Sequence, residues 1–79
     1  MRIDKFLKVS RLIKRRTVAA EACTAGRISV NGKVAKAGQD VKVGDTVEIR
    51  FGEKSLTVEI LEIKETVGKN EAGAMYREI

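Results

Sequence analysis

The sequence of 79 residues contains no histidine, no proline, no tryptophan and a single cysteine, Cys23. Because zinc sites need clusters of cysteine and histidine, we expect no metal and no cofactor. One cysteine cannot form a disulfide within the chain, as is typical of proteins of the reducing cytosol. No uncharged run exceeds five residues, which is too short for a transmembrane helix or the apolar core of a signal peptide. We therefore expect a cytoplasmic protein with no membrane partner.

Aromatic residues and catalytic motifs are also scarce. Only Phe6, Phe51 and Tyr76 are aromatic, which disfavours the capture of single strands by base stacking. There is no glycine-rich phosphate loop and no nucleophile elbow. Several carboxylates lie on predicted strand surfaces or in the tail, where we interpret them as solvated side chains: Glu48, Glu59, Glu62 and Glu65. We predict that the protein is not an enzyme and has no catalytic residues.

Positive charge is concentrated in the first half of the chain. Residues 1–36 carry a net charge of +8 and residues 37–79 a net charge of −3. Residues 5–16 include no acid, although a solvated helix face would mix both signs. Because such a density of positive charge repels itself, the pattern favours binding to a polyanion, with nucleic acid as the first candidate. An anionic membrane surface is the second candidate, and the shortage of large apolar residues disfavours it.

Apolar spacing in the first quarter of the chain predicts two helices. The buried face of the first is formed by residues three and four apart: Ile3, Phe6, Leu7, Ser10 and Ile13. We expect this helix to end near Lys14, with Asp4 acting as a cap or as a partner for a nearby arginine. Thr17 is the predicted cap of a second helix, and Gly26 fits the left-handed residue that closes it. We expect Cys23 to lie in the core.

After Gly26 the apolar period changes to two, which predicts antiparallel strands. Asn31-Gly32 indicates a type I′ hairpin, because both turn positions need positive φ. Further alternation, with turns at 44–45 and 52–53, places these apolar residues on strands: Val41, Val43, Val47, Ile49, Phe51, Leu56, Val58 and Ile60. The predicted fold is α+β, with two N-terminal helices packed on a small antiparallel sheet. We assign residues 1–65 to this domain and residues 66–79 to a polar C-terminal tail, frayed or with a short helix near Met75.

The basic residues indicate structured RNA as the ligand. Arginine binds phosphate with a planar pair of donors, so Arg11, Arg15 and Arg16 are the expected anchors. Lys5, Lys8 and Lys14 are expected to act as point charges. Arg2 is expected to lie beside Arg16. The predicted hairpin adds Asn31 and Lys33 as candidate RNA contacts. The second helix is rich in alanine and lacks the side chains that read a DNA major groove. A compact cationic corner suits the shape and phosphates of folded RNA.

These motifs together resemble the S4 RNA-binding domain. The matching stretches are "RIDKFL" at residues 2–7, "KRR" at 14–16, "GRISVNG" at 26–32 and "VKVGDTV" at 41–47. Because no other domain is attached, the chain is most similar to the free-standing heat shock protein 15 family. Within that family it resembles the short Gram-positive-type members, which begin almost identically with "DKFLKVSRLIKRRT" and whose tail is similar to "EAGAMYREI".

The resemblance implies the helix-pair RNA-binding fold known as the alpha-L motif and a role in ribosome-associated quality control. The implied partners are large-subunit rRNA, peptidyl-tRNA, the obstructed large ribosomal subunit and an RqcH-type (NFACT) protein that extends stalled chains with alanine. The chain would be ribosome-associated and bacterial. We expect a monomer, since the predicted sheet is short.

Two alternatives stay open at the level of sequence. The protein could be a generic rRNA- or tRNA-binding module, or a heat-shock-type recycling factor for the large subunit, with no role in tailing. It could also be an adaptor whose specificity lies in an acidic sheet face that includes Glu48, Glu59 and Glu62.

Overall fold

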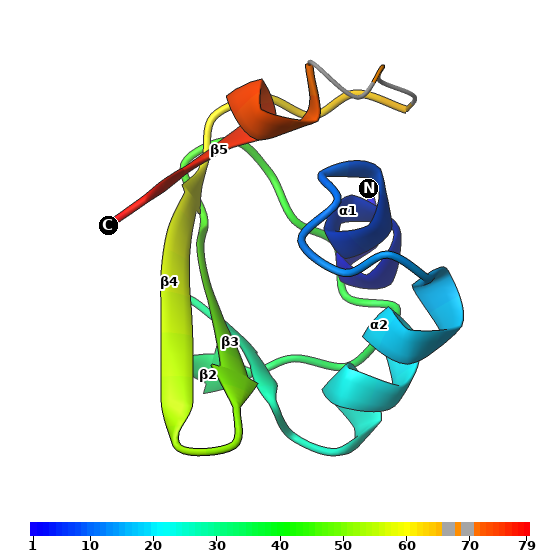
Figure 1. The fold of residues 1–79 in the computed structure, drawn as a ribbon, viewed down its shortest axis with the longest axis vertical. Helices are drawn as coiled ribbons and strands as arrows, with labels where there is room; N and C mark the ends of the chain where they lie inside the picture. Colours follow the sequence, from blue (N-terminus) through cyan, green and yellow to red (C-terminus); the bar gives the residue numbers. More distant parts are fainter. Residues whose placement is uncertain (66–67, 69–70) are drawn as a thin grey trace.

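Two helices lie on one face of a single antiparallel sheet (Figure 1). The computed structural model describes residues 1–65, 68 and 71–79. The helices are α1 (Ile3–Val9) and α2 (Arg16–Thr24), and a short 3-10 helix, η1, spans Ala72–Met75. The strands are β1 (Ile28–Val30), β2 (Lys33–Val34), β3 (Thr46–Phe51), β4 (Lys54–Ile60) and β5 (Tyr76–Glu78). The predicted α+β class is confirmed.

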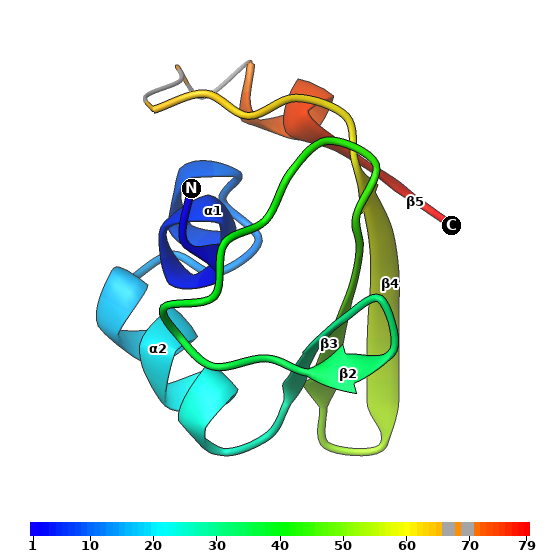
Figure 2. The same ribbon diagram turned by 180° about the vertical axis from the view of Figure 1, so that it is seen from behind.

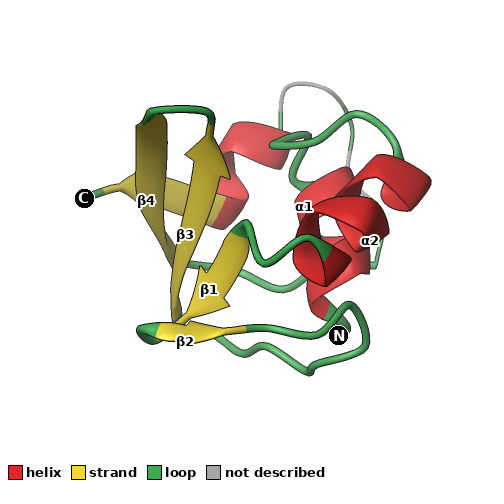
Figure 3. Ribbon diagram, turned by 90° about the horizontal axis from the view of Figure 1, so that it is seen from below, coloured by secondary structure: helices red, strands yellow, loops and turns green. Residues whose placement is uncertain are grey.

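The sheet has the strand order β2-β1-β3-β4-β5, and every neighbouring pair is antiparallel. Side chains alternate across it, so that Val47, Ile49 and Val58 are buried against the helices. The helices supply facing side chains that include Ile3 and Phe6. Figure 3 shows these two layers, with the sheet on one side and the helices on the other.

Helix α1 is shorter than predicted, since it ends at Val9 and not near Lys14. Arg11 has a φ of 64°, in the left-handed region, and its N–H donates to the carbonyl of Lys8. This backbone closes the helix, while the N–H of Ile13 donates to the carbonyl of Leu7. Ile13 still packs against the core, but from a turn. The apolar spacing therefore predicted correctly that Ile13 packs against the core, but it predicted wrongly that Ile13 is helical.

The start of α2 also differs from the prediction. The helix begins at Arg16, with Arg15 as the N-cap residue and no side-chain capping bond. Thr17 therefore lies within the first turn, where it is exposed, and it is not the cap. The predicted end of the helix is confirmed, because Gly26 has a φ of +76°. Cys23 is buried in the core, as expected.

The hairpins agree with the turn signals. Asn31 and Gly32 have φ values of 52° and 85°, as a type I′ turn requires. The β3–β4 hairpin pairs Phe51 with Lys54 around the predicted turn at 52–53. Residues 41–43 are not a strand, however, and Val43 is exposed whereas Val41 is buried.

The C-terminal segment adds a strand that the sequence pattern did not indicate. Strand β5 pairs with the end of β4, and Met75 just before it is fully buried. The short helix η1 lies in this same segment, over the top of the sheet in Figure 1. Residues 66–67 and 69–70 of the predicted tail lie outside the described residues. None of the described helices is long and apolar enough to span a membrane.

Candidate nucleic-acid interface

The start of α1 is held against the loop that joins β2 to β3. The N–H of Val41 donates to the carbonyl of Met1 (2.9 Å), and the N–H of Ile3 donates to the carbonyl of Gln39 (2.7 Å). Figure 2 shows this loop running beside α1, on the side nearer to the viewer. The backbone on either side of Arg2 is therefore fixed by tertiary contacts, which limits where its side chain can lie.

A buried carboxylate holds two arginines at the start of the two helices. The side chain of Asp4 is only 4% exposed; its Oδ2 lies 3.1 Å from Nη2 of Arg2 and its Oδ1 lies 3.5 Å from Nη2 of Arg16. The backbone N–H of Lys5 also donates to Oδ1 of Asp4 (2.7 Å). The predicted placement of Arg2 beside Arg16 is confirmed, and so is the role of Asp4 as an arginine partner.

The two guanidinium groups are oriented but remain accessible. The side chain of Arg2 is 52% exposed and that of Arg16 is 46% exposed. Arg2 also lies over Gly38, where a methyl group on the glycine Cα would come within 3.7 Å of Nη2. One carboxylate for two guanidinium groups leaves one positive charge. Free N–H groups on both arginines can therefore donate to an incoming phosphate without reorganisation.

Four further cations lie at the C-terminal end of α1, in the turn and at the N-cap of α2. They are exposed, and within the described residues no carboxylate lies within 4 Å of their charged groups: Lys8, Arg11, Lys14 and Arg15. We call these four residues, together with Arg2 and Arg16, the helix corner. Arg15 and Arg16 lie at the positive end of the α2 dipole, so they add to its potential instead of neutralising it. The helix corner is therefore suited to anions.

Lys5, another predicted contact, has a carboxylate partner outside the helix corner. Its ammonium group forms an ion pair with the carboxylate of Glu65. The hydrogen bond and the positive charge of Lys5 lower the pKa of the Glu65 carboxyl below its ordinary value. The pair joins α1 to the segment after β4, and Lys5 is less exposed than Arg2 or Arg16.

Asn31 and Lys33 lie apart from the helix corner, because the β1–β2 turn is at the end of the sheet away from the helices (Figure 3). Both ends of the Asn31 amide are engaged within the fold. Its Nδ2 donates to Oδ1 of Asp45 (3.1 Å), and its Oδ1 accepts the N–H of Thr46 (2.9 Å). Asn31 therefore ties the hairpin to the start of β3, whereas Lys33 is exposed on β2.

The carboxylates proposed for an acidic sheet face are paired with cations. Nε of Arg50 lies 3.6 Å from Glu48, Nε of Arg77 lies 2.7 Å from Glu59, and Nζ of Lys64 lies 3.1 Å from Glu62. Two of these pairs are two residues apart in sequence, and this spacing was visible without a structure. The pairing neutralises these three carboxylates, which weakens the adaptor alternative.

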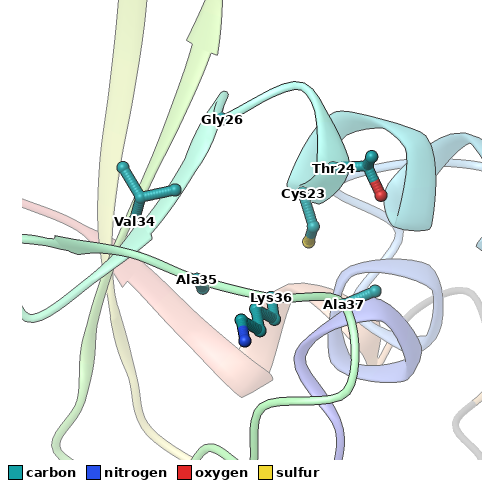
Figure 4. A pocket seen from close by; sticks show the side chains of 7 residues that line it. All are labelled: Cys23, Thr24, Gly26, Val34, Ala35, Lys36 and Ala37. Atoms are coloured by element: carbon teal, nitrogen blue, oxygen red, sulfur yellow. The ribbon is translucent and has the colours of Figure 1, made fainter.

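A cavity of about 530 Å³ lies between the end of α2 and the segment after β2 (Figure 4). Its lining is mostly small or apolar and includes Cys23, Val34 and Ala35, with Lys36 at its side. Burial raises the pKa of the Cys23 thiol, so the thiol is neutral at pH 7. The described residues contain no group of side chains suited to a metal ion.

The chain matches known proteins over most of its length. Residues 1–47, which include the whole helix corner, match the S4 domain. The chain is 67% identical to the RQC P-site tRNA stabilizing factor of Halalkalibacterium halodurans, over 96% of this chain and 86% of that protein. It is 60% identical to the factor of the same name from Bacillus subtilis, over 96% of this chain and 88% of that protein. The chain belongs to the S4 domain family, among the RQC P-site tRNA stabilizing factors.

Two solved structures of similar proteins have the same fold. Vibrio cholerae heat shock protein 15, described as trimeric, superimposes with a TM-score of 0.92 at 32% identity, over 100% of this chain and 81% of that chain. The solution structure of the hypothetical protein HP1423 gives a TM-score of 0.86 at 34% identity, over 100% of this chain and 96% of that chain. The resemblance to the heat shock protein 15 family is confirmed.

Proposed function

We propose that this S4 domain protein binds large ribosomal subunits that are obstructed by peptidyl-tRNA and stabilises the tRNA in the peptidyl site. The names of its relatives, RQC P-site tRNA stabilizing factors, support this role. In this proposal it contacts both large-subunit rRNA and the tRNA in the cytoplasm, and it supports alanine tailing by an RqcH-type protein. It acts as a monomer and catalyses no reaction.

The observation that carries the proposal is the helix corner. Arg2 and Arg16 are held by the buried carboxylate of Asp4, and four more exposed cations without a nearby carboxylate surround the turn between the helices. Phosphate binding by such a cluster releases condensed counterions, which drives association. Because the two arginines are already oriented, little side-chain entropy is lost when RNA binds.

The proposed mechanism is a shift in population between tRNA positions. A protein that contacts the tRNA only in the peptidyl site lowers the free energy of that position by its differential affinity. No bond is made or broken. Among the predicted contacts, we assign the RNA phosphates to the six residues of the helix corner. Three further predicted contacts are not part of this assignment and stay predictions. Lys5 pairs with Glu65, and Asn31 and Lys33 lie at the β1–β2 hairpin, away from the helix corner.

The test is association with purified large subunits, with and without peptidyl-tRNA, across a salt series. For about five phosphate contacts the log–log slope of affinity against salt should be roughly −3.5 to −4.5, and losing one contact should flatten it by about one. We expect that flattening for Arg16→Gln and not for Arg77→Gln, which removes an equally charged arginine that pairs with Glu59.

The outcomes separate the competing functions. Preference for subunits that carry peptidyl-tRNA, reduced in Arg16→Gln, supports the proposed function. Equal affinity for empty subunits or free rRNA would leave a generic RNA-binding module. Tight binding to peptidyl-tRNA subunits with no effect on alanine tailing by an RqcH-type protein would favour a recycling factor.

A further inference from the structure

A second group of cationic side chains lies on the outer face of the sheet, which the helices do not cover. Ile28 and Ile49 point into the core and are at most 1% exposed. Side chains alternate along strands, so their neighbours Arg27 and Arg50 point to the opposite face, and both are exposed. The N–H of Arg50 donates to the carbonyl of Arg27 (2.9 Å), which places the two residues directly opposite one another.

The two arginines form a pair that the fold itself does not favour. Like charges directly opposite on neighbouring strands destabilise a sheet. The only carboxylate of the described residues within 4 Å of either guanidinium is Glu48, 3.6 Å from Nε of Arg50. On the same face, Arg77 and Glu59 form a closer pair at 2.7 Å. The face is thus neutralised at β5 but keeps a net positive charge at Arg27 and Arg50.

The same row continues with a hydroxyl donor. Ser55 is paired with Arg50 in the β3–β4 register, and it is exposed on the same face. Neighbouring strands lie about 5 Å apart, so two guanidinium groups and a hydroxyl form a short line of donors. Arginine and serine are among the side chains that most often bind nucleic-acid phosphates.

We propose that Arg27 and Arg50, with Ser55 beside them, form a second phosphate-binding patch for an RNA segment different from the one at the helix corner. The proposal rests on the proposed function, because it assigns binding of RNA phosphates to the outer face of the sheet as well as to the helix corner. The helices and their corner lie on the inner side of the sheet and the patch lies on its outer side. Because the helix corner and the outer patch lie on opposite sides of the sheet, two different RNA segments can bind to them at the same time.

The test is a titration of the isotope-labelled full chain with a short RNA hairpin, followed by the amide chemical shifts. We expect two separate sets of shifts, one at the helix corner and one around Arg27, Arg50 and Ser55. The second set should persist in Arg16→Gln and disappear in the double variant Arg27→Gln/Arg50→Gln. Arg77→Gln, with the same charge change as each single substitution on the same face, should leave both sets in place.

Stability gives a second readout that a purely structural role would not produce. Relief of the like-charge repulsion should keep or raise the melting temperature of Arg27→Gln, although its RNA affinity falls. Shifts confined to the helix corner would overturn the proposal and leave the proposed function intact. Shifts at the outer patch alone would support the patch and contradict the role of the helix corner. An equal response to polyglutamate would overturn the assignment to RNA and indicate an acidic protein partner.

Discussion

The helix half and the sheet half of this protein carry the same kinds of cationic side chain but differ in how carboxylates are placed among them. At the helix corner, Lys8, Arg11, Lys14 and Arg15 have no carboxylate within 4 Å among the described residues. In the sheet half and just after it, three cations pair with glutamates: Arg50 with Glu48, Lys64 with Glu62, and Arg77 with Glu59. Net charge alone therefore does not locate a polyanion site. A local excess of exposed cations over nearby carboxylates does, as at the helix corner.

In the helix half, Asp4 shows a second use of a carboxylate. A surface glutamate beside a lysine neutralises one charge and contributes little to stability. Asp4 is buried, serves two arginines, and orients both towards solvent. A carboxylate thus neutralises a single cation in the sheet, whereas at the helix corner it holds two arginine side chains in position.

The largest expected effect is that of Asp4→Asn. Removing the buried charge takes away the carboxylate that Arg2 and Arg16 share. We expect a loss of about 2 kcal/mol in the free energy of unfolding, less than for a fully buried pair because both arginines are half exposed. RNA affinity should fall as well. Urea denaturation measures the first quantity and binding to large subunits the second.

The control for Asp4→Asn is Asp40→Asn. Asp40 is 87% exposed and lies 3.9 Å from the N-terminal amine. We expect its substitution to change the unfolding free energy by less than about 0.5 kcal/mol. Equal losses in the two variants would mean that Asp4 does not organise the arginines.

A second, matched pair of double variants compares the two halves directly. Lys8→Gln/Arg15→Gln removes one lysine and one arginine without carboxylate partners, and Lys64→Gln/Arg77→Gln removes one of each that is paired. The first should flatten the salt dependence of binding to large subunits by about two, and the second should leave it nearly unchanged. If both flatten the slope equally, only overall charge matters and the helix corner is not a site.

Two non-glycine residues with left-handed backbone, Arg11 and Asn31, allow a third comparison. Arg11, in the helix half, has an exposed side chain, so Arg11→Gly should relieve strain and raise the unfolding free energy by about 1 kcal/mol while it weakens RNA binding. Asn31, in the sheet half, should respond in the opposite direction. Asn31→Gly loses both side-chain hydrogen bonds and should lower stability by about 1 kcal/mol. Thermal and urea denaturation test both, and the prediction fails if the two changes have the same sign.

The smallest expected effect concerns the pH dependence of stability at Cys23. Burial raises the pKa of this thiol in the folded state, so the unfolded chain loses its proton at a lower pH than the folded chain. Stability should therefore fall as the pH rises through the ordinary thiol range, and the fall should end once the folded thiol ionises as well. Unfolding free energies measured from neutral to alkaline pH should decline more steeply for the wild type than for Cys23→Ala. Identical slopes would show that the thiol ionises equally in both states.

Local signals in the sequence were enough for the elements whose conformation is set by a few neighbouring residues. The Asn31-Gly32 hairpin and the left-handed Gly26 were predictable because few residues tolerate positive φ. The buried positions on α1 were predictable because period and burial are directly linked. Strand β5 was not, since its pairing with β4 depends on a contact between distant parts of the chain.

The positive charge of the first half was determined by the sequence alone, because net charge depends only on composition, and the prediction of a polyanion partner followed from it. Which cations are available was decided by the tertiary structure. Only folding brings Arg2 and Arg16 to one carboxylate, Lys5 to Glu65, and Arg77 to Glu59. Ion pairs act over a few ångströms, and the last two of these join residues that are far apart in the chain. The distance between each cation and the nearest carboxylate in the folded chain therefore decides whether that cation is available to a ligand, and this distance cannot be read from the sequence.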